Sequence, residues 1–438
     1  MIANAPIVLL LALSARTVTL EEAVRAAEAQ KPEVRVAQAN AAAGVARTVQ
    51  ARAPALPQVK VEAEYDRTTG NRRQRPGRST LVDNSWNFYN WFEGQVTGTQ
   101  LIWDFGKTLN SWRAAEMRAV ALADTERATR LEAVGTVRVA YFRARAAKAL
   151  IAVASQTLAN QERHLAQITG FVQAGTRPEI DLAQSRATSA NARVGVIRTE
   201  NDFTVARAQL NQAMGTAGDT DYDIADDGFP PVPGETGPLG PLIDEAIRAR
   251  PDLAALDRRV LADELAARSA RGGYWPSLNL VGGGREEGQS WKQTPTIDNL
   301  GNVTQQGGMA WNVWGGVQLS WPVFQGLLTR GQVREADAAL VAARAERDGL
   351  VNEVWVAVQQ AATSVRSAQE ALVASDQALT AARERLRLAD GRYTAGVGSI
   401  IELSDAELGS TTAGAQRVAA EYALATARAA LVLALGRT

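Results

Sequence analysis

Two acidic residues in the last part of the chain have a spacing that could serve ion selection. Glu402 and Asp405 lie three positions apart at the start of a predicted helix, so both carboxylates share one helical face. Rings of carboxylates around a water-filled passage favour cations and repel anions. Alternatively, the two acids only interact with the positive end of the helix dipole, a contribution of about 0.3–1 kcal/mol. The spacing alone leaves both interpretations open.

Other residues that commonly carry chemistry are scarce. The chain has no Cys, one His and four Met, which excludes thiolate metal sites, Cys nucleophiles and disulfides. The single His164 lies beside Arg163 inside a predicted helix and is expected to face solvent rather than act as a general base. We predict no catalytic residue, no metal site and no cofactor. Lys plus Arg and Asp plus Glu both total 47, so nothing favours a nucleic-acid partner.

Two very long helices are expected from heptad patterns. Apolar or small residues recur at 3,4 spacing over about six heptads in each half of the chain, which is typical of coiled-coil packing. The long helices are predicted at about 107–170 and 326–392, and a Gly-containing turn separates each from a further helix at about 178–214 and 399–436. At 1.5 Å per residue the first would be roughly 95 Å long, more than a compact core needs. A plain dimeric coiled coil explains this pattern but not the strands.

Four strands are expected before the long helices, at about 57–68, 92–104, 275–287 and 310–323. From Trp311 onward apolar residues alternate with polar ones, the pattern of a strand with lipid on one face and water on the other. A soluble sandwich core would alternate in the same way. Four strands cannot close a membrane barrel, since the smallest need about eight, so the chain is expected to oligomerise. Polar loops at 68–85 and 286–308 are expected to cover the extracellular end.

The same order of elements occurs twice, at an interval of about 220 residues. Ala174-Gly175 followed by Ile180-Asp181-Leu182, for example, returns as Ala395-Gly396 followed by Ile401-Glu402-Leu403. We predict a first repeat at 17–227, a linker at 228–241 and a second repeat at 242–438. Residues 1–16 contain a short apolar run and are predicted to be a secretion signal, although no Lys or Arg precedes that run.

The segment Arg392-Tyr-Thr-Ala-Gly-Val-Gly-Ser-Ile-Ile-Glu-Leu-Ser-Asp-Ala-Glu407 resembles the most recognisable signature of TolC-like outer membrane efflux proteins. The stretch from Phe171 to Gln184 is similar to the turn of that family's other hairpin, and the resemblance covers the chain from about Leu20 onward. It implies a mainly α-helical fold with membrane β-structure. Long antiparallel coiled-coil helices would form a periplasmic α-barrel, and four strands per chain would contribute to a trimeric, 12-stranded outer-membrane β-barrel.

The resemblance also implies a function. The protein would be the passive exit duct of a tripartite efflux pump or a type I secretion system, in the bacterial outer membrane and extending into the periplasm. Its partners would be two further copies, outer-membrane lipid, a periplasmic adaptor protein and an inner-membrane transporter. The alternative is a periplasmic coiled-coil adaptor or scaffold without a membrane barrel, which would not need four alternating strands.

Residue roles implied by the resemblance lie at the two helical turns. The family pattern places around the periplasmic aperture Asp181, Tyr393, Glu402 and Asp405. The hairpin tips that would contact the adaptor are Gly175, Thr176, Arg177, Gly396, Val397 and Gly398. The chain departs from the pattern at Gly398, where better-known members carry an Arg that ties neighbouring hairpins together. Arg177 or Arg392 would be the candidates to replace it.

Overall fold

A computed structural model describes residues 16–69, 88–218, 221–288, 294–297, 303–306 and 309–437. Two compact units are formed by Met1–Ala41 with Leu122–Leu256 and Glu346–Thr438, and by Ala42–Ala121 with Asp257–Ala345. The predicted signal at 1–16 lies outside the described residues except for Arg16, and so does most of the predicted loop at 68–85.

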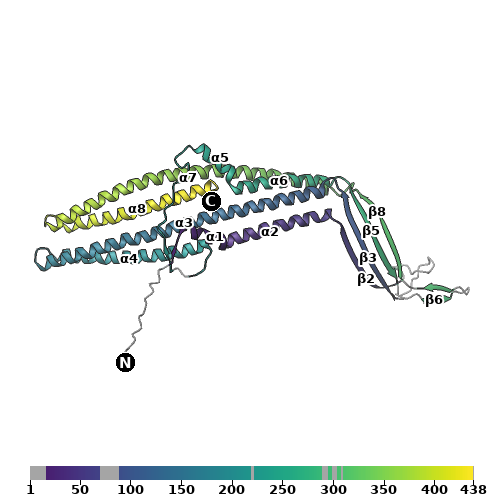
Figure 1. Cartoon of the computed structure of the whole chain (residues 1–438), viewed down its shortest axis with the longest axis horizontal. Helices are drawn as coiled ribbons and strands as arrows, with labels where there is room; N and C mark the ends of the chain where they lie inside the picture. The colour runs from purple at the N-terminus through teal and green to yellow at the C-terminus, as the bar shows by residue number, and fades with distance from the viewer. Residues whose placement is uncertain are drawn as a thin grey trace, which may run out of the picture. The chain divides into compact units, whose positions relative to one another are not determined.

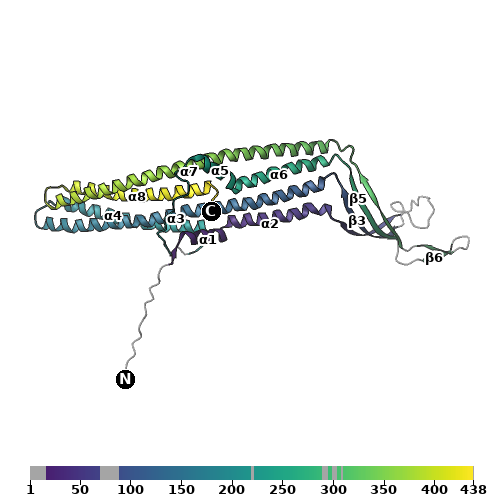
Figure 2. The ribbon, with the colours of Figure 1, turned by 45° about the horizontal axis from the view of Figure 1, so that its top comes forward.

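The first unit is built on two antiparallel helical hairpins. One consists of α3 (Lys107–Gln173) and α4 (Glu179–Met214), and the other of α7 (Leu328–Thr394) and α8 (Ile400–Ala434). Figures 1 and 2 show α4 returning along α3 and α8 returning along α7. The helices α3 and α7 each have 67 residues. They end at 173 and 394 rather than near 170 and 392, because the last turn of each helix continues into the glycine that ends it.

Each repeat opens with two consecutive helices. The first repeat has α1 (Leu20–Gln30) and α2 (Pro32–Arg52), and the second has α5 (Leu239–Ala249) and α6 (Pro251–Gly272). Each break falls directly before a proline, where Lys31 and Arg250 have extended backbone. The reason is that a proline ring disfavours helical conformation in the residue before it, whereas proline itself is accepted in a first helical turn.

Three apolar clusters hold the helices of the first unit together, and the two largest lie one in each repeat. The cluster of the first repeat includes Ala27, Val137, Tyr141, Phe142 and Leu210, beside the short parallel pair β1 (Thr17–Val18) and β4 (Asp223–Ile224). The cluster of the second repeat is centred on α5, α7 and α8 and includes Leu242, Ile243, Val354, Val358 and Leu431. The many alanines at the helix contacts allow the close packing that the heptad pattern predicts.

The linker at 228–241 is fixed to the second hairpin by a buried carboxylate. Glu235 accepts hydrogen bonds from Arg428 Nη2 at 2.8 Å and Nε at 3.0 Å, from Gln369 Nε2 at 2.7 Å and from the Val232 amide at 2.8 Å. Burial acts to raise the pKa of Glu235, but the hydrogen bonds from Arg428 and Val232 outweigh it and lower that pKa. The linker is therefore an ordered part of the helical unit.

The second unit contains a four-stranded antiparallel sheet. Its strands β2 (Gln58–Thr69), β3 (Phe88–Trp103), β5 (Ser277–Gly288) and β8 (Met309–Ser320) pair in the order β2-β3-β5-β8. Two bounds differ from the predicted ones by more than two residues. Strand β3 begins at Phe88 instead of near 92, because Phe88 to Trp91 continue the ladder with β2. Strand β8 ends at Ser320, where its partner β5 begins at Ser277.

The predicted loop at 286–308 contains regular structure. Within it, β6 (Thr294–Ile297) pairs antiparallel with β7 (Val303–Gln306). The threonines, isoleucine and valine of these segments favour strand conformation, which the loop prediction overlooked. In the part of the chain that the structure describes, the helices lack an apolar stretch long enough to cross a membrane.

Candidate functional site

The turns that close the two hairpins have matching backbone geometry. Gly175 ends the turn after α3 with φ of +72°, and Gly396 ends the turn after α7 with φ of +81°. In both turns the amides of the first three residues after the helix donate back to carbonyls of its last turn, as in helix ends closed by a left-handed residue. A side chain is strained at positive φ, so glycine is the residue that suits each position.

Asp181 and Tyr393, predicted at the aperture, are brought into direct contact. The phenol of Tyr393, which is buried, donates a hydrogen bond to Asp181 Oδ2 at 3.2 Å. This joins the start of α4 to the end of α7. Burial, together with the charge and hydrogen bond of Asp181, raises the pKa of Tyr393 to about 12, so the phenol keeps its proton at neutral pH.

Arg177, predicted as a tip residue and as one candidate to replace the missing arginine, adds two more contacts to the same pair of hairpins. Its Nη2 donates to the backbone carbonyl of Tyr393 at 2.9 Å, and its guanidinium lies over the Tyr393 ring, 4.4 Å from the centroid. Arg392, the other candidate to replace the missing arginine, lies 3.5 Å from Glu402 in its own hairpin. Of these two candidates, Arg177 is therefore the one that contacts the other hairpin within the chain.

Gly398 has a local reason to lack a side chain. A Cβ atom at this position would lie 2.8 Å from the Tyr393 amide nitrogen and 3.0 Å from the Arg392 carbonyl carbon. Both atoms belong to the backbone of α7, so they could not move aside without disturbing the turn. Gly398 is also buried, whereas Gly175, Thr176, Gly396 and Val397 are exposed. Of the predicted tip residues, Gly398 is thus the one shielded by its own chain.

Glu402 and Asp405 are not joined to the Asp181–Tyr393 contact. The hydroxyl of Ser399 caps α8 by accepting from the Glu402 amide at 3.1 Å, which places Glu402 in the first helical turn. Glu402 is half-buried beside Arg392, and Asp405 is exposed. The position of Glu402 in the first turn of α8 is the one that the helix-dipole interpretation requires. Both carboxylates remain accessible to solvent.

The sequence interpretation missed a polar cluster between the hairpins, and its solvent-facing assignment of His164 is wrong. His164 is 7% exposed and its Nε2 lies 3.1 Å from Oε1 of Glu407, which is 6% exposed. Gln161 donates to Glu407 Oε2 at 2.6 Å. The error arose because heptad reasoning places polar residues outside, whereas Gln161 and His164, three positions apart on one helical face, both contact Glu407.

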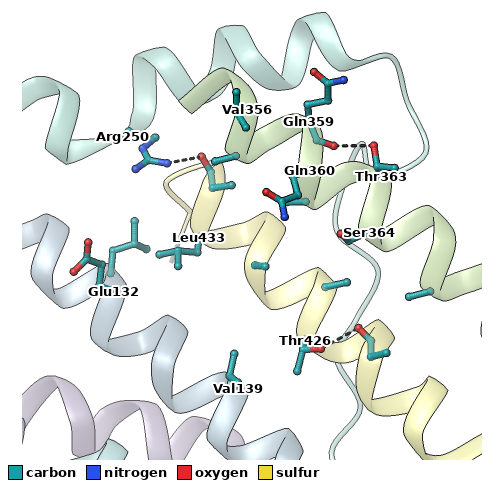
Figure 3. Close-up of a pocket in the computed structure, with 18 of the residues that line it drawn as sticks. Glu132, Val139, Arg250, Val356, Gln359, Gln360, Thr363, Ser364, Thr426 and Leu433 are labelled. Atoms are coloured by element: carbon teal, nitrogen blue, oxygen red, sulfur yellow. Dashed lines mark hydrogen bonds between the residues drawn. The ribbon is translucent and has the colours of Figure 1, made fainter. Parts of the chain in front are cut away.

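A cleft of about 1310 Å³ lies between α3, α7 and α8 in the first unit. Figure 3 shows its labelled side chains, which are mostly aliphatic or hydroxyl-bearing. Its cationic residue Arg250 is paired with Asp252 and donates to the Ala434 carbonyl. Among the described residues, no group of three or more His, Asp or Glu side chains could hold a metal ion.

Comparison with known proteins agrees with this architecture. The family model of the outer membrane efflux protein matches residues 23–216 and 242–437. The outer membrane protein TolC of Escherichia coli is 25% identical over 396 residues, covering 88% of this chain and 76% of the relative. The outer membrane protein OprJ of Pseudomonas aeruginosa is 26% identical over 357 residues, covering 78% of this chain and 69% of the relative.

A solved structure shows the same fold. The outer membrane protein VceC from Vibrio cholerae superposes with a TM-score of 0.79 at 17% identity, covering 95% of this chain and 96% of that one. The match to a family of transport channels does not favour the alternative of a periplasmic adaptor without membrane strands. Matched in both halves of its sequence, the chain belongs to the outer membrane efflux protein family and has that family's fold, outer-membrane location and role as an efflux channel.

Proposed function

We propose that three copies of this chain form a passive duct that carries cargo from the periplasm to the exterior. The observation that supports this most directly is that the four-stranded sheet of a single chain has two open edges. The outermost strands β2 and β8 are hydrogen-bonded on one side only within the described sheet. Their apolar residues are uncovered, with Val59 73% and Trp311 79% exposed. Open edges are not tolerated in lipid, so closure requires further copies.

The duct needs a closed resting state at its periplasmic end, and Arg177, Asp181 and Tyr393 would supply it. These three residues connect the first hairpin to the second through two hydrogen bonds and one cation–π contact. Opening would separate the hairpins and break all three contacts. Arg177 would then serve in place of the arginine that the family pattern has at Gly398.

The exposed tips would be the contact surface for a periplasmic adaptor protein. Gly175, Thr176, Gly396 and Val397 are exposed at the turns, and beside them Ile180 and Ile401 are 71% and 68% exposed. Clustered exposed apolar side chains mark protein contact sites. The inner-membrane transporter bound through that adaptor would supply the energy, so the chain itself would catalyse no reaction.

Glu402 and Asp405 would set the charge preference of the entrance. In a trimer, carboxylates near the start of α8 would form acidic rings that favour cations. We expect the double substitution Glu402→Gln with Asp405→Asn to lower the cation-to-anion permeability ratio several-fold, measured from reversal potentials under a salt gradient. The matched control Glu384→Gln removes an exposed acid paired with Arg387 on its own helix. An unchanged permeability ratio in the double variant would show that neither acid lines the constriction.

Single-channel recording of detergent-extracted trimers in planar bilayers tests the proposal as a whole. Discrete, cation-preferring conductance is the expected result, since it requires insertion, a continuous aqueous path and acidic rings together. Stable trimers that give no conductance at any voltage, even with Arg177→Ala and Tyr393→Phe to remove the contacts that close the entrance, would contradict the duct.

A further inference from the structure

An ionisable cluster connects the two hairpins close to the Arg177–Tyr393 contacts. We call His164, Asp390 and Glu407 the histidine cluster. His164 belongs to α3, Asp390 to α7 and Glu407 to α8, so the cluster joins one hairpin to both helices of the other. His164 Nδ1 lies 3.6 Å from Asp390 Oδ1, and His164 Nε2 lies 3.1 Å from Glu407 Oε1. His164 and Glu407 are buried and Asp390 is partly exposed, and burying ionisable groups is costly unless their charges compensate.

Among the described residues, no Lys or Arg lies within ion-pair distance of Asp390 or Glu407. From α3 itself, Gln161 donates to Glu407 and Gln167 lies 3.2 Å from His164 Nδ1. From α4, Asp181 is engaged by Tyr393. Arg383 of α7 lines a cavity of about 480 Å³ that Glu407 also lines. His164 is thus the group whose proton balances the two carboxylates at contact distance.

We propose that the histidine cluster is a proton-operated contact that holds the hairpins together when it is protonated and releases them when it is not. This inference rests on the proposed duct, whose opening separates the same hairpins. With its proton, the imidazolium ring lies between two carboxylates and attracts both. Without it, two carboxylates from α7 and α8 face a neutral ring, and the buried charge is no longer compensated.

The shifted pKa of Glu407 also favours the closed arrangement when the cluster is protonated. Burial raises the pKa of Glu407, the charge of His164 partly opposes this, and Asp390 raises it further. A group whose pKa is raised in the folded arrangement stabilises that arrangement at low pH and loses this contribution as the pH rises through the raised value. The closed arrangement is therefore favoured in acid and weakened as the pH rises.

The accessibility of a cysteine placed at the hairpin interface measures the release without any channel recording. Thr411 of α8 meets Thr157 of α3, with the two hydroxyls 2.9 Å apart, and the wild-type chain has no Cys. We would compare alkylation of Thr411→Cys with that of Thr412→Cys, an exposed neighbour, because their ratio cancels the intrinsic reactivity of a thiol. The ratio should rise about tenfold between about pH 5 and pH 8, as the histidine cluster loses its proton.

The double substitution His164→Gln with Glu407→Gln should flatten this ratio, because it removes the two buried titrating groups and retains polar side chains. Glu402→Gln with Asp405→Asn should leave the ratio rising, which separates the cluster from the acidic rings. A ratio that stays flat in the chain with an intact cluster overturns the inference, and that result does not depend on whether the glutamine variants fold.

Conductance then separates this inference from the proposed duct. The intact trimer should conduct more at pH 8 than at pH 5, and a disulfide between Thr157→Cys and Thr411→Cys should abolish that change until it is reduced. A rising alkylation ratio in trimers that never conduct would support the proton-operated contact and contradict the duct. Trimers that conduct but show a flat alkylation ratio would support the duct and contradict the proton-operated contact.

Discussion

Replacing Arg177 by Ala and Tyr393 by Phe in one chain should open the periplasmic entrance and raise single-channel conductance several-fold. The pair of changes removes the Arg177 hydrogen bond to the Tyr393 carbonyl, the cation–π contact and the Tyr393 hydrogen bond to Asp181. A hydrogen bond to a charged group contributes about 1.5–3 kcal/mol, and each 1.4 kcal/mol changes a population ratio about tenfold. The closed population should therefore fall by at least about tenfold.

Two variants serve as controls for this result. Arg387→Ala also removes an arginine, in this case one on α7. Arg387 is exposed and bonds to Glu384 on its own helix, so conductance should not change. Arg177→Lys keeps the charge and loses the planar group that lies over the ring, so it should be intermediate. If the double variant conducts like the wild type, these contacts do not hold the entrance closed.

Replacing Glu235 by Gln should cause the largest loss of stability among the substitutions considered. The change leaves the guanidinium of Arg428, which is 13% exposed, without its carboxylate. Breaking a buried ion pair in this way costs about 3–5 kcal/mol. The thermal midpoint of the detergent-solubilised trimer, followed by circular dichroism, should fall clearly below that of the wild type.

Glu245→Gln is the matched control for this substitution. Glu245 forms the same two-pronged bond with Arg437, through distances of 2.7 and 2.8 Å, but both side chains are partly exposed. Exposed pairs contribute about 0–1 kcal/mol, so its midpoint should barely change. Because the pKa of Glu235 is lowered, its contribution is present at neutral pH and disappears as the pH falls through that value. Equal losses in the two variants would show that burial of Glu235 is unimportant.

The sequence alone determined the long helices, the four strands of the main sheet and their order, but not β6 and β7. Heptad spacing predicted α3 and α7 because a long helix must keep one apolar face for its whole length, and alternation predicted β2 and β8 because strand side chains alternate between faces. Gly175 and Gly396 marked both hairpin turns, since a left-handed residue commonly ends a helix. These features are local, so each can be read from neighbouring residues.

Tertiary structure decided which side chains meet. Asp181 and Tyr393 are 212 positions apart, and Gln161 and Glu407 are 246 apart, so no local pattern pairs them. His164 was assigned to solvent because its own helix does not reveal that α7 and α8 cover it. The contact of Arg177 with Tyr393 exists only because the two turns are packed together, whereas the lack of room at Gly398 arises within its own turn. Periodicity fixes the face that a helix buries, but the partners on that face depend on how distant segments are placed.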